Sequence, residues 1–271
     1  MKPRFFVSCW GNEVDVAGAL SLAKQWQADG IEGPVPSDEA SRQSLLARGG
    51  EVPWIAEVAT GGGYVPRPRL TVEEHLHDLR RLIEGSLPFS PLLVNVLAGS
   101  DAWPFRDKLR FYQQALAMEA ELGVPLSFET HRSRPTFHPW VVRDLLLELP
   151  NLRLTCDFSH WCVVCERLVL DDEPELLELC ARHVRHVHAR VGYDQGPQVP
   201  DPRAPAFALV VEAHLRWWRR LAQASPGLTF TPESGPDGYQ QCEPFSQRPL
   251  ADLREVNAWM MQRLRDVMTA A

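Results

Sequence analysis

The 271-residue sequence lacks any run of about 18 apolar residues, the length that a membrane-spanning helix requires. Its first residues, MKPRFFVSCWGNEVDV, also lack the apolar stretch of a secretory signal peptide. We therefore expect a cytoplasmic protein that has no membrane partner.

A surplus of basic residues is absent as well. The chain has 28 lysines and arginines against 35 aspartates and glutamates, which gives a net charge of −7. Proteins that neutralise nucleic-acid phosphates normally carry an excess of positive charge. Nucleic acid is therefore not an expected partner.

Cysteine is too sparse for a disulfide framework. Six cysteines in 271 residues without a signal peptide are not the pattern of a disulfide-rich secreted domain. Cys162 and Cys165 have the CxxC spacing of redox and zinc sites, but no second pair accompanies them. Two buried free thiols are the simpler interpretation.

The chain does contain short strand-like runs that alternate with longer helical patterns. The strand-like runs cover residues 4–10, 30–36, 53–60, 92–99, 125–131, 152–158, 185–191 and 228–234. Helical patterns cover residues 16–30, 71–85, 105–123, 138–150, 206–224 and 249–268. This alternation predicts an α/β protein, a (β/α)8 TIM barrel that forms a single domain over residues 1–271. A doubly wound open sheet is the alternative.

The later strands carry polar residues on the face that should point into the barrel. Because side chains alternate across a strand, each run divides into an apolar face toward the helices and a second, inner face. The inner faces hold Ser127, Glu129 and His131; Thr155 and Asp157; His186, His188 and Arg190; and Thr229, Thr231 and Glu233. Barrel interiors are ordinarily filled with apolar side chains. Carboxylates buried together there are unfavourable unless a positive charge lies between them.

A divalent metal ion is the simplest such charge. Glu129, Asp157, His188 and Glu233 stand at the carboxyl ends of successive strands, where barrel active sites lie. Three carboxylates and one imidazole suit Mn²⁺, which we expect first, and also Mg²⁺, Co²⁺ or Zn²⁺. The alternative is a buried ion-pair network completed by Arg132, His186 and Arg190.

Four short motifs occur in order at these strand ends: FETH (128–131), CDFSHW (156–161), HVHAR (186–190) and TPESG (231–235). Together they resemble the xylose isomerase-like TIM barrel superfamily, and within it the sugar phosphate isomerase/epimerase branch that includes the ketose 3-epimerases. The resemblance implies that Glu129, Asp157, His188 and Glu233 bind one divalent ion. It also implies that Glu129 and Glu233 form the acid/base pair and that His160 contacts substrate oxygens.

Further side chains are expected to contact a small carbohydrate substrate. His131 and Arg190 share the inner faces of their strands with predicted ligands, and Asn95 is an inward polar residue of the run 92–99. Tyr193 lies in the loop VGYDQGPQVPDPR, where we expect substrate selection, with a plain surface loop as the alternative. Aromatic rings at strand ends can pack against a sugar or belong to the core. These rings are Trp10, Trp103 and Trp161.

Residues 61–68, GGGYVPRP, lack the Gly-Lys-Ser/Thr ending of a phosphate-binding loop. They predict a mobile loop over the barrel mouth, and Tyr64 at its tip is a candidate for closing on substrate. Trp217 and Trp218 lie mid-helix, where they indicate either packing or the contact of a homo-oligomer.

Three basic residues near the motifs are expected at the surface rather than in the site. Arg132 and Arg134 follow FETH and could bind a phosphate or carboxylate, but solvated arginines are favoured. His183 should end the helix before the seventh strand and face solvent.

These residues favour a metal-dependent isomerase or epimerase that acts on a sugar or sugar derivative by proton transfer through an enediolate. The same site could serve a dehydratase or lyase of a keto-sugar or keto-inositol, with His131 or His160 protonating the leaving oxygen. An endonuclease IV-like hydrolase is the remote alternative. It would need further histidines near the second and third strands, and residues 30–60 contain none.

Overall fold

A computed structural model describes residues 2–48 and 52–269, so the remaining positions of the predicted domain lie outside the described residues. Its parallel strands close into a barrel in sequence order. The strands are β1 (Arg4–Ser8), β2 (Gly30–Pro34), β3 (Trp54–Ala59), β4 (Leu93–Leu97), β5 (Leu126–Glu129), β6 (Leu154–Cys156), β7 (Val184–Ala189) and β8 (Thr229–Pro232). Pairing of β1 with β8 completes the barrel and excludes the open sheet. The predicted (β/α)8 TIM barrel is confirmed.

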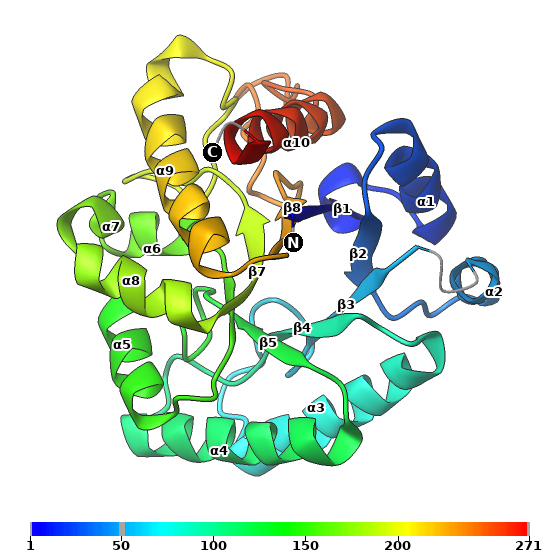
Figure 1. Ribbon diagram of the computed structural model, residues 1–271, viewed down its shortest axis with the longest axis vertical. Helices are drawn as coiled ribbons and strands as arrows, with labels where there is room; N and C mark the ends of the chain where they lie inside the picture. Colours follow the sequence, from blue (N-terminus) through cyan, green and yellow to red (C-terminus); the bar gives the residue numbers. More distant parts are fainter. Residues whose placement is uncertain (1, 49–51, 270–271) are drawn as a thin grey trace.

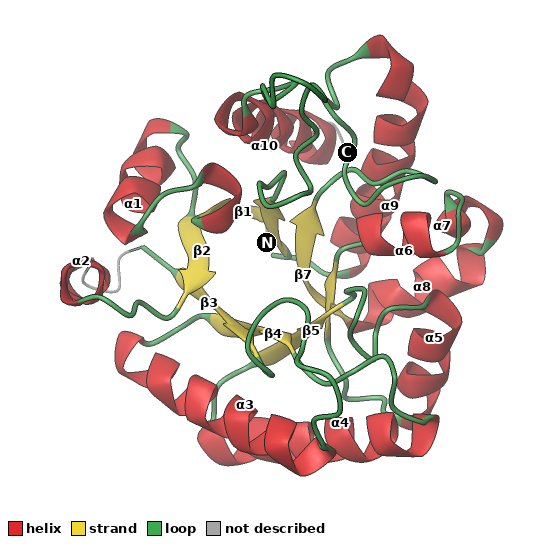
Figure 2. Ribbon diagram, turned by 180° about the vertical axis from the view of Figure 1, so that it is seen from behind, coloured by secondary structure: helices red, strands yellow, loops and turns green. Residues whose placement is uncertain are grey.

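Helices form a ring around the strands, as both views of the ribbon show (Figures 1 and 2). They are α1 (Val16–Gln25), α2 (Glu39–Ala47), α3 (Val72–Ser86), α4 (Phe105–Leu122), α5 (Pro139–Glu148), α6 (Ser159–Val164), α7 (Val169–Asp172), α8 (Pro174–His183), α9 (Ala208–Ala224) and α10 (Leu253–Thr269). Short 3-10 turns are η1 (Trp10–Asn12), η2 (Leu87–Phe89) and η3 (Pro205–Phe207). Helices α2, α6 and α7 are additions to the helical segments predicted from sequence, whereas α8 ends at His183 as expected.

Side-chain capping fixes where several helices begin. Asp15 accepts a hydrogen bond from the Gly18 amide at the start of α1. Thr71 and Glu74 form a reciprocal capping box at the start of α3. Such caps satisfy amides that have no partner within the helix. They also set where each loop from the barrel mouth joins its helix.

The barrel interior is divided into an apolar end and a polar end. Phe6, Ile55 and Leu93 form a small buried cluster of their own. Farther along the same strands, Glu57 pairs in register with Asn95. The change from apolar to polar side chains toward the strand ends places the polar groups where barrel active sites lie.

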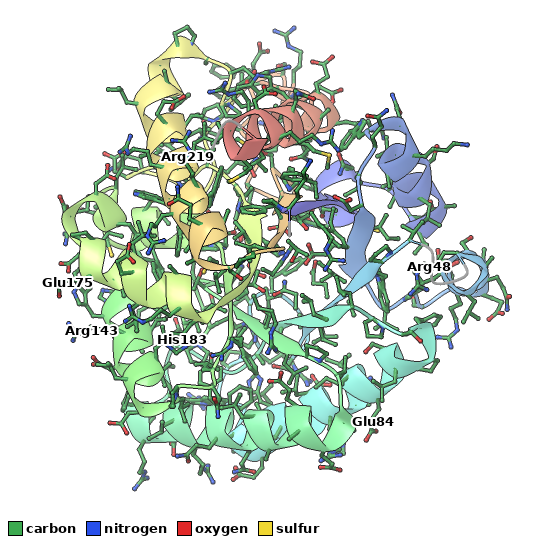
Figure 3. All side chains as sticks on the ribbon, viewed as in Figure 1. Arg48, Glu84, Arg143, Glu175, His183 and Arg219 are labelled. Atoms are coloured by element: carbon green, nitrogen blue, oxygen red, sulfur yellow. The ribbon has the colours of Figure 1, made fainter. Side chains whose placement is uncertain are left out.

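Several residues expected at the surface are buried. The His183 side chain is 7% exposed, and its Nδ1 lies 2.9 Å from the Leu152 carbonyl oxygen, which corrects its predicted exposure. In Figure 3, Glu84, Arg143 and Glu175 lie on the outer rim of the helical ring, whereas His183 lies farther in. Trp217 and Trp218 are also buried, so packing within the chain explains them.

No helix among the described residues is long and apolar enough to cross a membrane.

Candidate metal centre and substrate pocket

The four predicted ligands converge at one point inside the barrel. Glu129 ends β5, Asp157 follows β6, His188 lies on β7 and Glu233 follows β8. One potential ligand atom from each residue lies within 4.8 Å of those of the other three, and all four side chains are buried. Residues from four strands therefore form a single donor cluster.

The ring of His188 is held between this cluster and a buried carboxylate on β2. His188 Nε2 lies 2.9 Å from Glu32 Oε1, and because a carboxylate can only accept, this nitrogen carries the hydrogen. His188 Nδ1 lies 2.9 Å from Glu233 Oε2 and 3.5 Å from Glu129 Oε2. It nevertheless makes no hydrogen bond within the described chain, since the Glu233 oxygen is not aligned with it. The Nδ1 atom is a buried nitrogen without a partner, directed at carboxylate oxygens.

Glu32 is a site residue that the sequence analysis missed. Its Oε2 lies 3.0 Å from His186 Nε2 and also accepts a hydrogen bond from the Thr231 hydroxyl. On the other side of the His186 ring, Nδ1 lies 2.7 Å from the Thr229 hydroxyl oxygen. This network lies one layer below the donor cluster and holds both histidine rings in position.

Asp157 is shared between the cluster and Arg190. The Arg190 guanidinium lies 2.5 Å from Asp157 Oδ2 and 2.8 Å from His160 Nε2. Ser159 donates to Asp157 Oδ1 through its backbone amide at 3.0 Å. Because Arg190 is fully buried, this contact fixes the orientation of the carboxylate. Asn95 holds Glu129 in a similar way, through an amide hydrogen bond of 3.0 Å.

Crowded acids set the electrostatics of the site. Burial raises the pKa of Glu233 to about 7, although the nearby His188 acts in the opposite direction. Burial also raises the Glu57 pKa well above its usual value, and the charges of Glu233, Glu32 and Glu129 add to this. Burial lowers the pKa of His188, but the same surrounding carboxylates outweigh it and raise the pKa well above the ordinary value. The site as a whole attracts positive charge.

A pocket opens beside the cluster, and three aromatic rings from different loops cover it. Trp10, Tyr64 and Tyr239 all line the pocket. The ring centroids of Trp10 and Tyr64 are 5.8 Å apart, and those of Trp10 and Tyr239 are 5.6 Å apart. The remaining lining consists of Glu57, Leu97, Glu129, His131, Arg190 and Glu233. We call the three rings the aromatic roof.

Arg134 anchors the loop that carries Tyr64. Its guanidinium donates to the carbonyl oxygens of Thr60 at 3.0 Å and Gly99 at 3.1 Å, and also to that of Gly63. The side chain is 1% exposed, so its predicted position at the surface is wrong. Gly61 to Gly63 all have positive φ, a conformation for which glycine is suited. Arg134 is therefore occupied in holding this glycine turn.

Three aromatic residues considered for substrate contact lie outside the pocket lining. Trp161 is fully buried and donates to the Thr136 carbonyl oxygen at 3.1 Å. The Tyr193 ring packs against Phe207, and its hydroxyl lies 3.3 Å from Gln241 Nε2. Trp103 donates to the Leu70 carbonyl oxygen at 3.1 Å. Local packing that the sequence pattern does not encode directs these rings away from the site.

None of the described cysteines lines the pocket. All six cysteines are free thiols. Burial raises the pKa of both Cys162 and Cys165, which keeps them in the unreactive thiol form. Cys162 is buried as expected, whereas Cys165 is only half-buried.

Comparison with known proteins gives matches at the level of structure. No protein-family model matches the chain, and no curated protein matches it. Among solved structures, D-allulose 3-epimerase from Methylomonas sp. in complex with D-allulose matches with a TM-score of 0.62 at 13% identity, covering 98% of this chain and 97% of that chain. The probable 3-DHS dehydratase AsbF from Bacillus anthracis matches with a TM-score of 0.63 at 10% identity, covering 97% and 98%. A xylose isomerase-like TIM barrel protein from Mycobacterium smegmatis in complex with magnesium matches with a TM-score of 0.61 at 14% identity, covering 98% and 97%.

The chain has a (β/α)8 barrel fold that is similar to the fold of these proteins. At these identities the likeness extends to the fold alone, and the reaction has to be argued from the site.

Proposed function

We propose that the protein is a divalent-metal-dependent isomerase or epimerase of a sugar or sugar derivative. The observation that carries the proposal is the buried His188 Nδ1 atom, which has no hydrogen-bond partner and is directed at Glu233 and Glu129. Glu32 holds one hydrogen on Nε2, and the carboxylates that face Nδ1 favour a positive charge there, which a proton supplies when no metal is bound, as the raised His188 pKa indicates. A divalent ion would displace that proton and bind the Nδ1 lone pair.

The donor set fits such an ion. His188 Nδ1 and Glu233 Oε2 are 2.9 Å apart, close to the separation of about 2.9–3.0 Å expected for adjacent ligands of an octahedral ion bound at about 2.1 Å. Glu129, Asp157, His188 and Glu233 would hold the ion, and the three carboxylates favour Mn²⁺ or Mg²⁺. When bound, it would polarise a substrate carbonyl and stabilise the negative charge that develops on deprotonation.

Glu129 and Glu233 are the proposed acid/base pair. Both line the pocket, and they come from β5 and β8, which are not adjacent in the barrel. Two carboxylates reaching the pocket from different strands allow one to remove a carbon-bound proton and the other to return a proton on another face or on the neighbouring carbon. The Asn95 amide orients Glu129 for this role.

Other lining residues would bind and enclose the substrate. His131 and Arg190 both line the pocket and are placed to bind substrate oxygens. His160 is hydrogen-bonded to Arg190 and would keep its guanidinium in position. The aromatic roof would cover the apolar edge of a sugar and exclude water from the reacting carbon. This lining supports a carbohydrate as the substrate class.

A dehydratase or lyase remains a second candidate on one specific observation. The ring centroids of His131 and His160 are 4.1 Å apart with the ring planes tilted by 53°, and His131 lines the pocket beside Glu129. To protonate a leaving hydroxyl after the same proton removal, this imidazole would have to carry an extra proton, a form that the nearby Glu129 carboxylate favours although burial lowers the His131 pKa to about 4. The AsbF match is consistent with this reaction class on the fold. The endonuclease IV-like alternative gains no support, because β2 and β3 contribute no histidine.

Metal stoichiometry tests the proposal first. Wild type, Glu233→Gln and His188→Ala would be stripped with chelator, reloaded with Mn²⁺ and analysed by mass spectrometry, with the exposed Glu148→Gln as the matched control. We expect one ion per chain in wild type and control and a loss in the other two. Manganese-loaded protein should then catalyse deuterium uptake from solvent into a ketose or aldose.

Each contrary result has a definite meaning. Absence of metal binding in wild type would show that the cluster is an ion-pair network and overturn the proposal. Two or three ions per chain would favour the hydrolase. Metal binding together with loss of water from a keto-sugar would assign the lyase reaction.

A further inference from the structure

Glu57 is a pocket carboxylate that the proposed mechanism does not use. It lies on β3, on the opposite side of the barrel from β7, and pairs in register with Asn95 of β4. The side chain is 8% exposed and lines the pocket. No hydrogen bond or ion pair within residues 2–48 and 52–269 reaches its carboxyl group. A buried carboxyl without a partner is costly, so a pocket that retains one is built around something that binds it.

The charged side chains that line the pocket provide no cationic partner for Glu57. Three carboxyl groups, Glu57, Glu129 and Glu233, line it. Among the described residues that line the pocket, only Arg190 is a lysine or arginine. Its guanidinium is already paired with Asp157 at 2.5 Å. A divalent ion at the proposed metal centre would offset Glu129 and Glu233, which are two of its ligands. Glu57 is not in that ligand set, so no described group of the pocket offsets the charge of its ionised form.

The surroundings of Glu57 resemble a site for an ammonium group. Tyr64 and Trp10, part of the aromatic roof, line the same pocket, and their ring centroids are 5.8 Å apart. A carboxylate combined with electron-rich aromatic faces binds an organic cation through an ion pair and through cation–π attraction. Neither Tyr64 nor Glu57 makes a side-chain hydrogen bond to a described residue, so both are free to contact a ligand.

We propose that Glu57 is a specificity-determining residue that pairs with an ammonium group of the substrate, so that the protein acts on amine-bearing sugars. This inference rests on the proposed function, since it takes the reacting end of the sugar to be held by Glu129, Glu233 and the metal ion. The amine lies at the end of the sugar that faces β3. A phosphate or carboxylate at this position would face Glu57 with no free cation to offset it, so sugar phosphates and sugar acids are excluded.

Three matched sugars test the proposal through binding rather than turnover. The probes are 6-amino-6-deoxy-D-glucose, D-glucose and D-glucose 6-phosphate, which place a positive, neutral or negative group at the same carbon. Affinities would be measured by calorimetry on manganese-loaded wild type and Glu57→Gln, with Glu148→Gln as a control on an exposed helix position. Glutamine keeps the size of Glu57 and removes its charge. Thermal unfolding would verify that each variant is folded.

We expect wild type to bind the amino sugar at least tenfold more tightly than D-glucose and to bind the phosphate most weakly. In Glu57→Gln, the preference for the amino sugar over D-glucose should fall to about twofold or less. The Glu148→Gln control should keep the wild-type order.

The contrary outcomes separate this inference from the proposed function. Equal binding of the amino sugar and D-glucose to wild type would overturn the inference and leave the metal-dependent sugar site intact, as would a preference that persists in Glu57→Gln. Tightest binding of the phosphate would also overturn it. Failure of wild type to bind any of the three sugars, despite a bound metal ion, would overturn the sugar-enzyme proposal and this inference with it.

Discussion

His188 Nε2 lies 2.9 Å from Glu32 Oε1, on the opposite side of the imidazole from the contact between Nδ1 and Glu233. Glu32 thereby selects the tautomer of His188, since a hydrogen on Nε2 leaves the Nδ1 lone pair for a cation. The carboxylate lies in the layer below the cluster and would act on a bound ion only through this ring. Its effect on metal binding follows from that position.

Glu32→Gln should therefore weaken divalent-metal binding about 10- to 100-fold. An amide cannot accept from His186, His188 and Thr231 at once, so the His188 ring loses its fixed orientation. Titration calorimetry with Mn²⁺ measures the affinity, and nitrogen chemical shifts of the zinc-loaded protein report the tautomer. Glu84→Gln on α3 is the control. Unchanged affinity and tautomer in Glu32→Gln would contradict this role.

The barrel and the four-residue cluster could be predicted from sequence because both depend on repeated local patterns. The alternation of runs predicts the strands, and the polar inner faces of β5 to β8 place Glu129, Asp157, His188 and Glu233 at equivalent strand ends. Glu32 and Glu57 each stand alone as acids in otherwise apolar runs, GIEGP and WIAEVA. A single acid in such a run carries no periodic signal, so its orientation becomes visible only in the closed barrel.

The ring positions of Trp161 and Tyr193 were less predictable for a different reason. Both lie outside strands, Trp161 in α6 and Tyr193 in the loop after β7. Alternation does not apply there, and the direction of each side chain depends on partners far away in sequence, such as Thr136 for Trp161. The same holds for Arg134, whose carbonyl partners come from the loops after β3 and β4.

Gly235→Ala should disrupt the aromatic roof while leaving the barrel folded. A Cβ atom at this position would come within 2.1 Å of the Trp10 ring, so the indole must move. We expect a rise in KM of roughly tenfold or more for any sugar substrate, with metal affinity unchanged. The control is Gly85→Ala on α3, where the added methyl meets no atom within 4 Å. Equal kinetics in both variants would contradict a role for Trp10 in substrate binding.

Arg134→Ala should loosen the glycine turn that carries Tyr64. The substitution leaves buried carbonyl oxygens of Thr60 and Gly99 without their donor, which should cost about 2–4 kcal/mol of unfolding free energy. Hydrogen exchange of residues 60–64 should accelerate more than that of the barrel strands. Urea unfolding and exchange mass spectrometry measure the two effects, with the exposed Arg106→Ala as the control. Global destabilisation without faster local exchange would argue against anchoring of this turn.

Metal affinity should increase as the pH is raised through neutrality. Burial raises the pKa of Glu233 to about 7, so below that pH a proton competes with the ion for this carboxylate. The Mn²⁺ dissociation constant should fall between pH 6 and pH 8, with proton release on binding. Calorimetry in buffers of different ionisation enthalpy counts the released protons. Affinity independent of pH over this range would mean that Glu233 is already ionised.

The same carboxyl should make the metal-free protein less stable as the pH rises. A group whose folded pKa is raised from 4.5 to about 7 binds more protons in the folded state between those values, so its contribution to stability is present below about pH 4.5 and is lost on passing pH 7. Glu233→Gln removes this loss. In chelator, the unfolding free energy of the variant relative to wild type should therefore shift in its favour by about 1–3 kcal/mol between pH 5 and pH 8. Glu32→Gln should destabilise the protein throughout this range, because Glu32 has a lowered pKa and its ionised form contributes stability above the unfolded value. If the difference in unfolding free energy between Glu233→Gln and wild type stays constant with pH, the folded protein does not raise the pKa of Glu233. The cluster would then be stable with Glu233 ionised and no cation bound.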